Sequence, residues 1–377
     1  MLKILVVFGT RPEAIKLIPV IEELKKHPDR IETKICVTSQ HRQMLDQVLD
    51  LFGIKPDFNL DIMQENQNLQ AVTALIIQRL KQVIDELKPD WLLVQGDTTT
   101  TFVSSLAGFY SGIKVAHVEA GLRTWNKKEP FPEEINRVLT SRIADVHFAP
   151  TAAAKDNLVS EGIKPDSIWV TGNTVVDALQ MILNRINEKA VSSVFEFINN
   201  DKKVILVTGH RRESFGKKLQ NICAALKEIA RNHSDVEIVY PVHLNPNVWK
   251  PVHEVLGNIR NIHLIEPLDY LTFVYLMNRS SLIITDSGGI QEEAPSLGKY
   301  VLVTRDCTER PEGVEAGVAK LVGNSKEKIC LECENALIGN AVTLHEVKKR
   351  NPYGDGMASK RIAEIFLKGT CNEFIRE

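Results

Sequence analysis

Residues 283–294 read Ile-Ile-Thr-Asp-Ser-Gly-Gly-Ile-Gln-Glu-Glu-Ala, and this stretch decides the fold class. Its β-branched start is typical of a buried strand, and the Asp-Ser-Gly-Gly corner predicts a direct turn into a helix. At such a corner backbone N–H groups, a hydroxyl and the positive end of the helix dipole meet, which favours a bound phosphate. The alternative is a glycine-rich corner with no ligand.

The same change from strand to helix recurs along the whole chain. Short β-branched runs alternate with longer amphipathic stretches, which is typical of βαβ units and parallel sheets. The pattern predicts strands at 3–8, 33–38, 91–95, 114–118, 146–149, 168–171, 203–208, 236–240, 262–265, 282–285 and 300–304.

A polar stretch over 177–201, which resembles one long helix, separates the two series of strands and predicts a boundary near 172–200. We therefore expect an α/β protein with two Rossmann-like, doubly wound domains around a central cleft. The expected domains are 1–172 and 173–356, and a C-terminal helix within 357–377 is expected to pack back on the first domain. Ligands of such sheets bind at the carboxyl ends of the strands, so the loops that follow strands are the candidate sites.

Composition excludes several functional classes. The 377 residues carry a net charge of −2 without a basic tail, so nucleic acid is not an expected partner. No apolar run reaches the roughly 18–20 residues of a membrane span, and the apolar start is interpreted as a first strand, so we expect a cytoplasmic protein without membrane contact. The C-x-x-C pair Cys330 and Cys333 lacks a second pair, so ordinary thiols and no metal are expected.

The first strand-to-helix corner, at 8–16, lacks the G-x-G-x-x-G spacing of a dinucleotide-binding turn, so NAD is not expected as a cofactor. Arg11 and Lys16 would lie beside the positive end of the helix, where they suit an anion. The alternative is a surface helix start with two solvated cations.

Four acids follow the next strands of the first domain. Asp97 precedes four threonines and is equally consistent with a helix N-cap and with a functional group. Glu119 ends a buried strand, where an isolated carboxylate is costly unless it is paired or used. Glu133 and Glu134 begin a helix, and complementing the helix dipole is the simpler interpretation of that pair.

The second domain offers cations and a proton carrier. His210 follows the strand at 203–208, and Arg211 beside it offers charge for an anionic group. Glu293, one turn into the helix after the glycine corner, is placed for the diol of a ribose, and Arg310 supplies a cation from the next loop. His243 ends another strand and is less specific.

Taken together, these loops resemble one family, the non-hydrolysing UDP-N-acetylglucosamine 2-epimerases. The resemblance covers nearly the whole chain through ordered blocks: GTRPEAIK, QHRQMLDQ, QGDTTTT, HVEAGLRT, PEEINR, GHRRESFG, PVHLNPNV, TDSGGIQEEAPSLGK, TERPEGV and NPYGDG. It implies a fold like that of GT-B glycosyltransferases, a homodimer, and interconversion of UDP-GlcNAc and UDP-ManNAc without a metal or other cofactor.

Inversion at C2 of an N-acetyl sugar requires removal of a proton that no neighbouring carbonyl acidifies. Departure of UDP from C1 in the same process would make that proton acidic, and the family reacts in this way, through 2-acetamidoglucal. The resemblance assigns the catalytic roles to Asp97, Glu119, Glu133 and His210. It assigns substrate and UDP binding to Arg11, Lys16, Phe273, Ser287, Gly288, Gly289, Glu293 and Arg310. It assigns an allosteric UDP-GlcNAc site to Gln40, Gln43, Glu134, Arg211 and His243.

Three other functions remain open from the sequence. A GT-B glycosyltransferase would use the same phosphate corner but needs only one base. A hydrolysing epimerase would release free ManNAc and UDP. A catalytically silent nucleotide-sugar sensor would keep Ser287 and Glu293 but could dispense with the acids.

Overall fold

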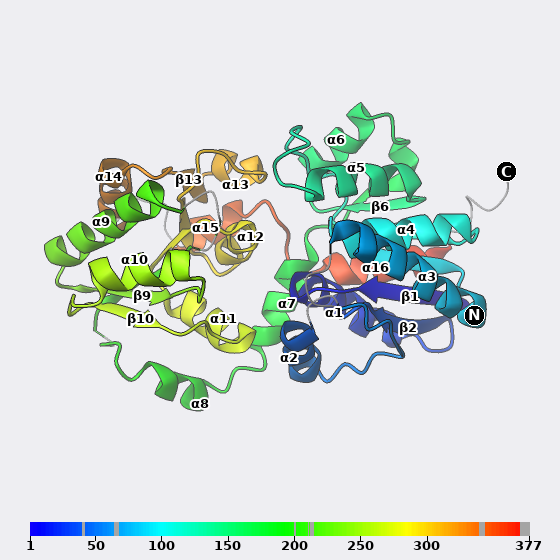
Figure 1. Cartoon of the computed structure of the whole chain (residues 1–377), viewed down its shortest axis with the longest axis horizontal. Helices are drawn as coiled ribbons and strands as arrows, with labels where there is room; N and C mark the ends of the chain where they lie inside the picture. Colours follow the sequence, from blue (N-terminus) through cyan, green and yellow to red (C-terminus); the bar gives the residue numbers. More distant parts are fainter. Residues whose placement is uncertain are drawn as a thin grey trace. The chain divides into compact units, whose positions relative to one another are not determined.

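The computed structural model describes residues 1–39, 42–63, 68–199, 201–209, 211, 215–338 and 344–369, without the side chains of 42–44, 189, 190 and 344. The chain divides into two compact units (Figure 1). Unit 1 comprises Met1–Ala178 and Gly354–Glu377, and unit 2 comprises Leu179–Tyr353.

Unit 1 is built on a parallel sheet of seven strands in the order β3-β2-β1-β4-β5-β6-β7. Leu5 of β1 pairs with Lys34 of β2 on one side and with Leu92 of β4 on the other. The central strands are apolar almost throughout, as expected for a sheet with helices on both faces. The elements of unit 1 are β1 (Leu2–Phe8), α1 (Arg11–Lys25), β2 (Ile31–Val37), α2 (Arg42–Phe52), β3 (Phe58–Asn59), α3 (Leu69–Leu87), β4 (Trp91–Gln95), α4 (Thr99–Tyr110), β5 (Lys114–Val118), α5 (Glu133–Ile143), β6 (Val146–Ala149), α6 (Ala152–Ser160), β7 (Ile168–Val170), the first half of α7 (Thr174–Leu183), and α16 (Ala358–Lys368).

Unit 2 repeats the plan with six parallel strands in the order β10-β9-β8-β11-β12-β13. Ile284 of β11 pairs with Val207 of β8 and with Leu302 of β12, so the strand before the glycine corner lies inside the sheet. The elements of unit 2 are α8 (Glu188–Ser192), β8 (Lys203–Thr208), α9 (Lys217–Asn232), β9 (Val236–Pro241), α10 (Pro246–Leu256), β10 (Ile262–Ile265), α11 (Tyr270–Arg279), β11 (Leu282–Thr285), α12 (Gly288–Ser296), β12 (Tyr300–Val303), α13 (Pro311–Glu315), β13 (Ala319–Leu321), α14 (Lys326–Leu337) and α15 (Leu344–Arg350).

Every expected strand is present, with ends that differ by at most about two residues. The sequence pattern missed β3 and β13, because runs this short at a sheet edge show no alternation. The single helix expected over 177–201 is wrong. The segment contains α7, a turn, α8 and a short 3₁₀ helix, and the break falls at Asn187, whose carbonyl accepts the first hydrogen bond of α8 at 3.0 Å. Asparagine favours such helix starts over helix interiors.

The division between the units falls within α7 instead of before it. Asp177 accepts hydrogen bonds from the N–H groups of Ala358 and Ser359, at 3.3 and 2.8 Å, and from the Ser359 hydroxyl. These contacts fix the start of α7 to the start of α16, which places both in unit 1. The expected boundaries, after residues 172 and 356, therefore each differ from the observed division by a few residues.

The C-terminal helix α16 packs on unit 1, and Figure 1 shows it in red among the blue and cyan elements. Phe366 meets Trp91 of β4 and Phe148 of β6, with ring centroids 5.6 and 5.9 Å apart. The returning C-terminal helix of the expected fold class is therefore confirmed.

Among the helices of the described residues, none combines the length and the apolar character that crossing a membrane requires. Cys330 and Cys333 lie on α14 as free thiols, and burial raises the pKa of Cys333 to about 12. No group of three or more His, Cys, Asp or Glu side chains within the described ranges is arranged to hold a metal ion.

Candidate active site

One buried carboxylate joins the loops that follow β1 and β4. Glu13 of α1 is 1% exposed. Its Oε2 accepts the N–H groups of Gly9 and Thr10 at 3.1 and 2.7 Å, and its Oε1 accepts the hydroxyls of Thr98 and Thr101 at 2.7 and 3.1 Å. Burial raises the pKa of Glu13, and these hydrogen bonds oppose that change. The loop that carries Arg11 and the loop that carries Asp97 are thus fixed to each other.

The threonine run also settles what caps α4. The hydroxyl of Thr98 accepts the N–H of Thr101 at 3.1 Å, so Thr98 is the N-cap. The interpretation of Asp97 as that cap is wrong, and its carboxylate is left for another role.

Asp97 is held by α5. Its carboxylate forms an ion pair with Arg137, and its backbone carbonyl accepts the side-chain amide of Asn136 at 2.9 Å. The side chain of Asp97 is 28% exposed whereas that of Arg137 is 5% exposed, so the buried partner fixes the more accessible one. Glu133 lies one turn earlier on α5 and is half-buried.

Glu119 lies beside Asp97's loop in a strained conformation. Its backbone φ is +64°, in the left-handed region that non-glycine residues rarely adopt. Its carboxylate pairs with Lys16 and accepts the side-chain amide of Asn173 at 3.0 Å. A Cβ on Gly96 would lie 3.9 Å from Glu119 Oε1, so the carboxylate approaches the residue that precedes Asp97. Strain that surrounding contacts hold in place is a feature of functional sites.

His117 of β5 orients the turn at Gly96. Its Nε2 lies 2.7 Å from the Gly96 carbonyl, and this contact requires Nε2 to carry the proton. The ring is completely buried, which lowers the pKa of His117 to about 3, and Arg123 and Arg137 add to the effect. His117 is therefore a neutral positioning group and not an acid or base near pH 7.

This burial predicts a loss of stability in mild acid. Between pH 6.5 and about 3 the unfolded chain protonates His117 while the folded chain does not, so the unfolding free energy should fall as the pH falls through that range. His117→Gln keeps an N–H donor but cannot titrate, so it should lose less stability than the unaltered protein between pH 6.5 and 4. Urea unfolding at several pH values measures the difference. His27→Gln, in the turn after α1, is the control. The prediction is contradicted if the unaltered protein and His117→Gln lose equal amounts of unfolding free energy between pH 6.5 and 4.

Glu134 anchors the chain between β5 and α5. It is 3% exposed, accepts the N–H of Trp125 at 2.9 Å and lies 3.3 Å from Arg137. These contacts, more than the helix dipole, explain why a second acid begins α5.

In unit 2 the glycine corner starts α12 as expected. Ser287 is the N-cap residue, and its hydroxyl makes no cap hydrogen bond. A Cβ on Gly289 would meet nothing within 4 Å, so the backbone there faces open space. A Cβ on Gly288 would lie 2.6 Å from Nη1 of Arg310, so the guanidinium lies directly against the corner. The N–H groups of a helix's first turn beside a cation form a suitable site for a phosphate.

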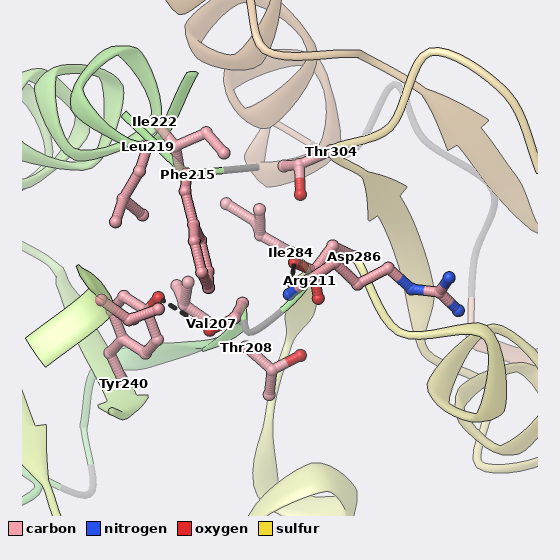
Figure 2. A pocket seen from close by; sticks show the side chains of 12 residues that line it. Val207, Thr208, Arg211, Phe215, Leu219, Ile222, Tyr240, Ile284, Asp286 and Thr304 are labelled. Atoms are coloured by element: carbon pink, nitrogen blue, oxygen red, sulfur yellow. Dashed lines mark hydrogen bonds between the residues drawn. The ribbon is translucent and has the colours of Figure 1, made fainter. Parts of the chain in front are cut away.

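A small pocket lies beneath the loop after β8 (Figure 2). Apolar side chains such as Phe215 and Tyr240 form most of its wall. Arg211 and Asp286 lie at one side, where the N–H of Arg211 donates to Asp286 Oδ2 at 3.0 Å. The Arg211 guanidinium points away from the apolar wall.

The remaining predicted residues are divided among several places. Glu293 is buried on α12, Phe273 is half-buried on α11, and His243 is exposed after β9. His210 and Gln40 lie outside the described residues, as does the side chain of Gln43.

Sequence reasoning missed the residues that hold the candidate groups. Glu13, three residues after Thr10, has the spacing of a capping box, which could have identified its contact with the Thr10 N–H. Nothing in the sequence pairs Arg137 with Asp97 or Asn173 with Glu119, since these contacts join distant segments.

Comparisons with known proteins identify the family of the chain. A family model described as UDP-N-acetylglucosamine 2-epimerase matches residues 22–367. A UDP-N-acetylglucosamine 2-epimerase of Campylobacter jejuni is 54% identical over 381 residues, covering 99% of each chain. A crystal structure of UDP-GlcNAc 2-epimerase from Neisseria meningitidis bound to UDP-GlcNAc is 52% identical, with a TM-score of 0.90 over 97% of this chain and 100% of that one. MurG of Acinetobacter baumannii, 16% identical over 97% of this chain and 99% of its own, shares the fold alone, with a TM-score of 0.59.

Proposed function

Because the chain belongs to the UDP-N-acetylglucosamine 2-epimerase family, we propose that it is an isomerase that interconverts UDP-GlcNAc and UDP-ManNAc. The observation that carries the proposal is the nearly full-length match at 54% identity, since the acids and the glycine corner form part of the matched chain. The Neisseria relative binds UDP-GlcNAc.

We propose elimination and re-addition as the route. A base removes the C2 proton while the C1–O bond breaks, its electron pair leaves with UDP, and a double bond forms between C1 and C2. UDP then adds back to C1 as a proton reaches C2 from the opposite face. This chemistry needs proton-transfer groups for both faces of the sugar, and Asp97, Glu119 and Glu133, with His210, are the candidates.

The contacts of unit 1 support these assignments. Asp97 and Glu119 each pair with a buried cation, Arg137 and Lys16, and such a partner restricts where a carboxylate can point. Lys16 therefore positions Glu119. Arg11, at the start of α1, is the more direct candidate for binding the phosphates of the substrate.

Unit 2 supplies the leaving-group site in this proposal. The N–H groups of Gly288 and Gly289, with the Ser287 hydroxyl and Arg310, would stabilise the charge that develops on UDP as C1–O breaks, because the Ser287 N–H already donates to the Thr285 hydroxyl at 2.9 Å. Glu293 and Phe273 would bind the uridine. No cofactor or metal is part of the route.

The finer regulatory features are also proposals. Arg211, Glu134 and His243, with Gln40 and Gln43, would bind a second UDP-GlcNAc as an activator, and the protein would act in the cytoplasm as a homodimer. Its product would supply ManNAc-type sugars for cell-surface polysaccharides.

Incubation with UDP-GlcNAc in deuterated water tests the proposed function. NMR should show UDP-ManNAc with deuterium at C2, because the C2 proton exchanges with solvent in the proposed route. Free ManNAc with UDP would favour the hydrolysing reaction instead, and transfer only when an acceptor is added would favour a glycosyltransferase. Epimerised product without deuterium would reject the exchange route.

A further inference from the structure

Three arginines meet at one buried carboxylate next to the glycine corner. Glu309, between β12 and α13, has a side chain that is 5% exposed. Its Oε2 lies 2.6 Å from Nη1 of Arg305, and its Oε1 lies 2.7 Å from Nη1 of Arg310 and 3.4 Å from Nη2 of Arg211. Burial alone would raise the pKa of Glu309, but the arginines hold it well below its usual range. Glu309 is therefore ionised and forms ion pairs with three arginines at once.

Two carboxylates, those of Glu309 and Glu292, determine where the Arg310 guanidinium lies. Glu309 pairs with Nη1 of Arg310, and Glu292 of α12 pairs with its Nε at 2.6 Å. The guanidinium is planar, so two carboxylates at different nitrogens fix both its position and its plane. That position is against Gly288, the first residue of α12. Glu309 thus helps to point Arg310 at the site where the leaving group would lie.

Arg211 competes for the same carboxylate oxygen. Its backbone is fixed by Asp286, the residue before Ser287, while its guanidinium reaches Glu309 Oε1 at the looser distance of 3.4 Å. Glu309 Oε1 pairs with both Arg310 and Arg211, so a change at one arginine alters the ion pair of the other with this oxygen. Charge-assisted hydrogen bonds are strong enough for such sharing to change an affinity.

We propose that Glu309 is a positioning residue for diphosphate recognition, and that through Oε1 it couples the state of Arg211 to the affinity for UDP. The inference rests on the proposed function, which places the diphosphate at Arg310. An anion that engages Arg211 withdraws that guanidinium from Oε1. Oε1 of Glu309 then pairs with Arg310 alone, while Oε2 keeps Arg305, and Glu309 orients Arg310 for the diphosphate. Two ligands are coupled when the binding of one changes the free energy of binding of the other, and a carboxylate oxygen shared between their sites provides such a link.

Titration calorimetry with UDP, with no sugar nucleotide present, tests the positioning role. Glu309→Gln should raise the Kd for UDP about tenfold, and in the epimerase assay KM should rise more than kcat falls. The conservative Glu309→Asp keeps the charge and should recover part of the loss. Glu237→Gln is the matched control. Glu237 lies on β9 of unit 2, and its side chain is 8% exposed. Like Glu309 it forms ion pairs, with Lys202 at 2.9 Å and with His263 at 2.6 Å. The control should bind UDP as the unaltered protein does.

A double-mutant cycle tests the coupling. Arg211→Gln should lower the Kd for UDP several-fold when Glu309 is present and by less than twofold in the Glu309→Gln background. An unchanged Kd in Glu309→Gln, or equal effects of Arg211→Gln in both backgrounds, would overturn the inference. If Glu309→Gln does not fold, the cycle is run with Glu309→Asp, in which the shorter carboxylate should reduce the effect of Arg211→Gln without abolishing it, and an undiminished effect there would overturn the inference. An unaltered protein that fails to epimerise UDP-GlcNAc would instead overturn the proposed function.

Discussion

The kcat for epimerisation should fall by about 10²–10⁴-fold when Asp97, Glu119 or Glu133 is replaced by its amide, which is the usual contribution of one general acid or base. Glu119→Gln is the sharpest of these tests. Glutamine has nearly the same size and can still accept the hydrogen bonds from Asn173 and Lys16, so the loss reports the missing negative charge and not a change in packing. That charge serves both proton transfer and the ion pair with Lys16. Initial rates with saturating UDP-GlcNAc measure it, and His210→Asn extends the series.

Asp145→Asn provides the matched control. Asp145 directly precedes β6, at the amino-terminal edge of the same sheet, where its side chain accepts the N–H of Val115 at 2.8 Å. An asparagine can accept the same hydrogen bond, so its kcat should match that of the unaltered protein. Near-normal turnover in all of the candidate variants would reject the acid and base assignments.

Glu13→Ala should lower the free energy of unfolding by roughly 2–6 kcal/mol, which is about 1–3 kcal/mol for each of the two backbone N–H groups left without an acceptor. Those donors belong to Gly9 and Thr10, and both lose their contact with Glu13 Oε2. Turnover should fall as well, because the loops of Arg11 and Asp97 are no longer joined. Urea unfolding, followed by circular dichroism, measures the loss.

Glu23→Ala is the control on the same helix. Glu23 pairs with Lys26 at the surface, and a change of this kind is usually within about 0.5 kcal/mol. Equal stabilities of the Glu13→Ala and Glu23→Ala variants would mean that water or neighbouring groups replace the lost acceptor.

The corners that carry candidate groups could be predicted from the sequence, because each combines a buried strand with a polar or glycine-rich turn. Asp97, Glu119 and Ser287 lie at such corners in the structure. Their partners could not be predicted, because contacts between segments that are far apart in sequence depend on the order of strands in the sheet. Strand β4 lies next to β1, and only this order brings Thr98 to Glu13.

The same limit explains the error at the linker. The polar stretch over 177–201 is consistent with a helix by composition, yet residues at and just before its start form hydrogen bonds with distant residues. Asn173 donates to Glu119, and Asp177 accepts from Ser359. The division between the units is set by these contacts and not by a change in composition.

The return of α16 has a consequence for how the protein is made. Domains generally fold from the N-terminus onward as the ribosome extends the chain. Here Phe366 covers Trp91 and Phe148, so the core of unit 1 lacks a packed aromatic side chain until almost the whole chain has been synthesised. Unit 2, which is contiguous from Leu179 to Tyr353, has all of its residues before unit 1 does. The half of the protein that is translated first is therefore the last to be completed.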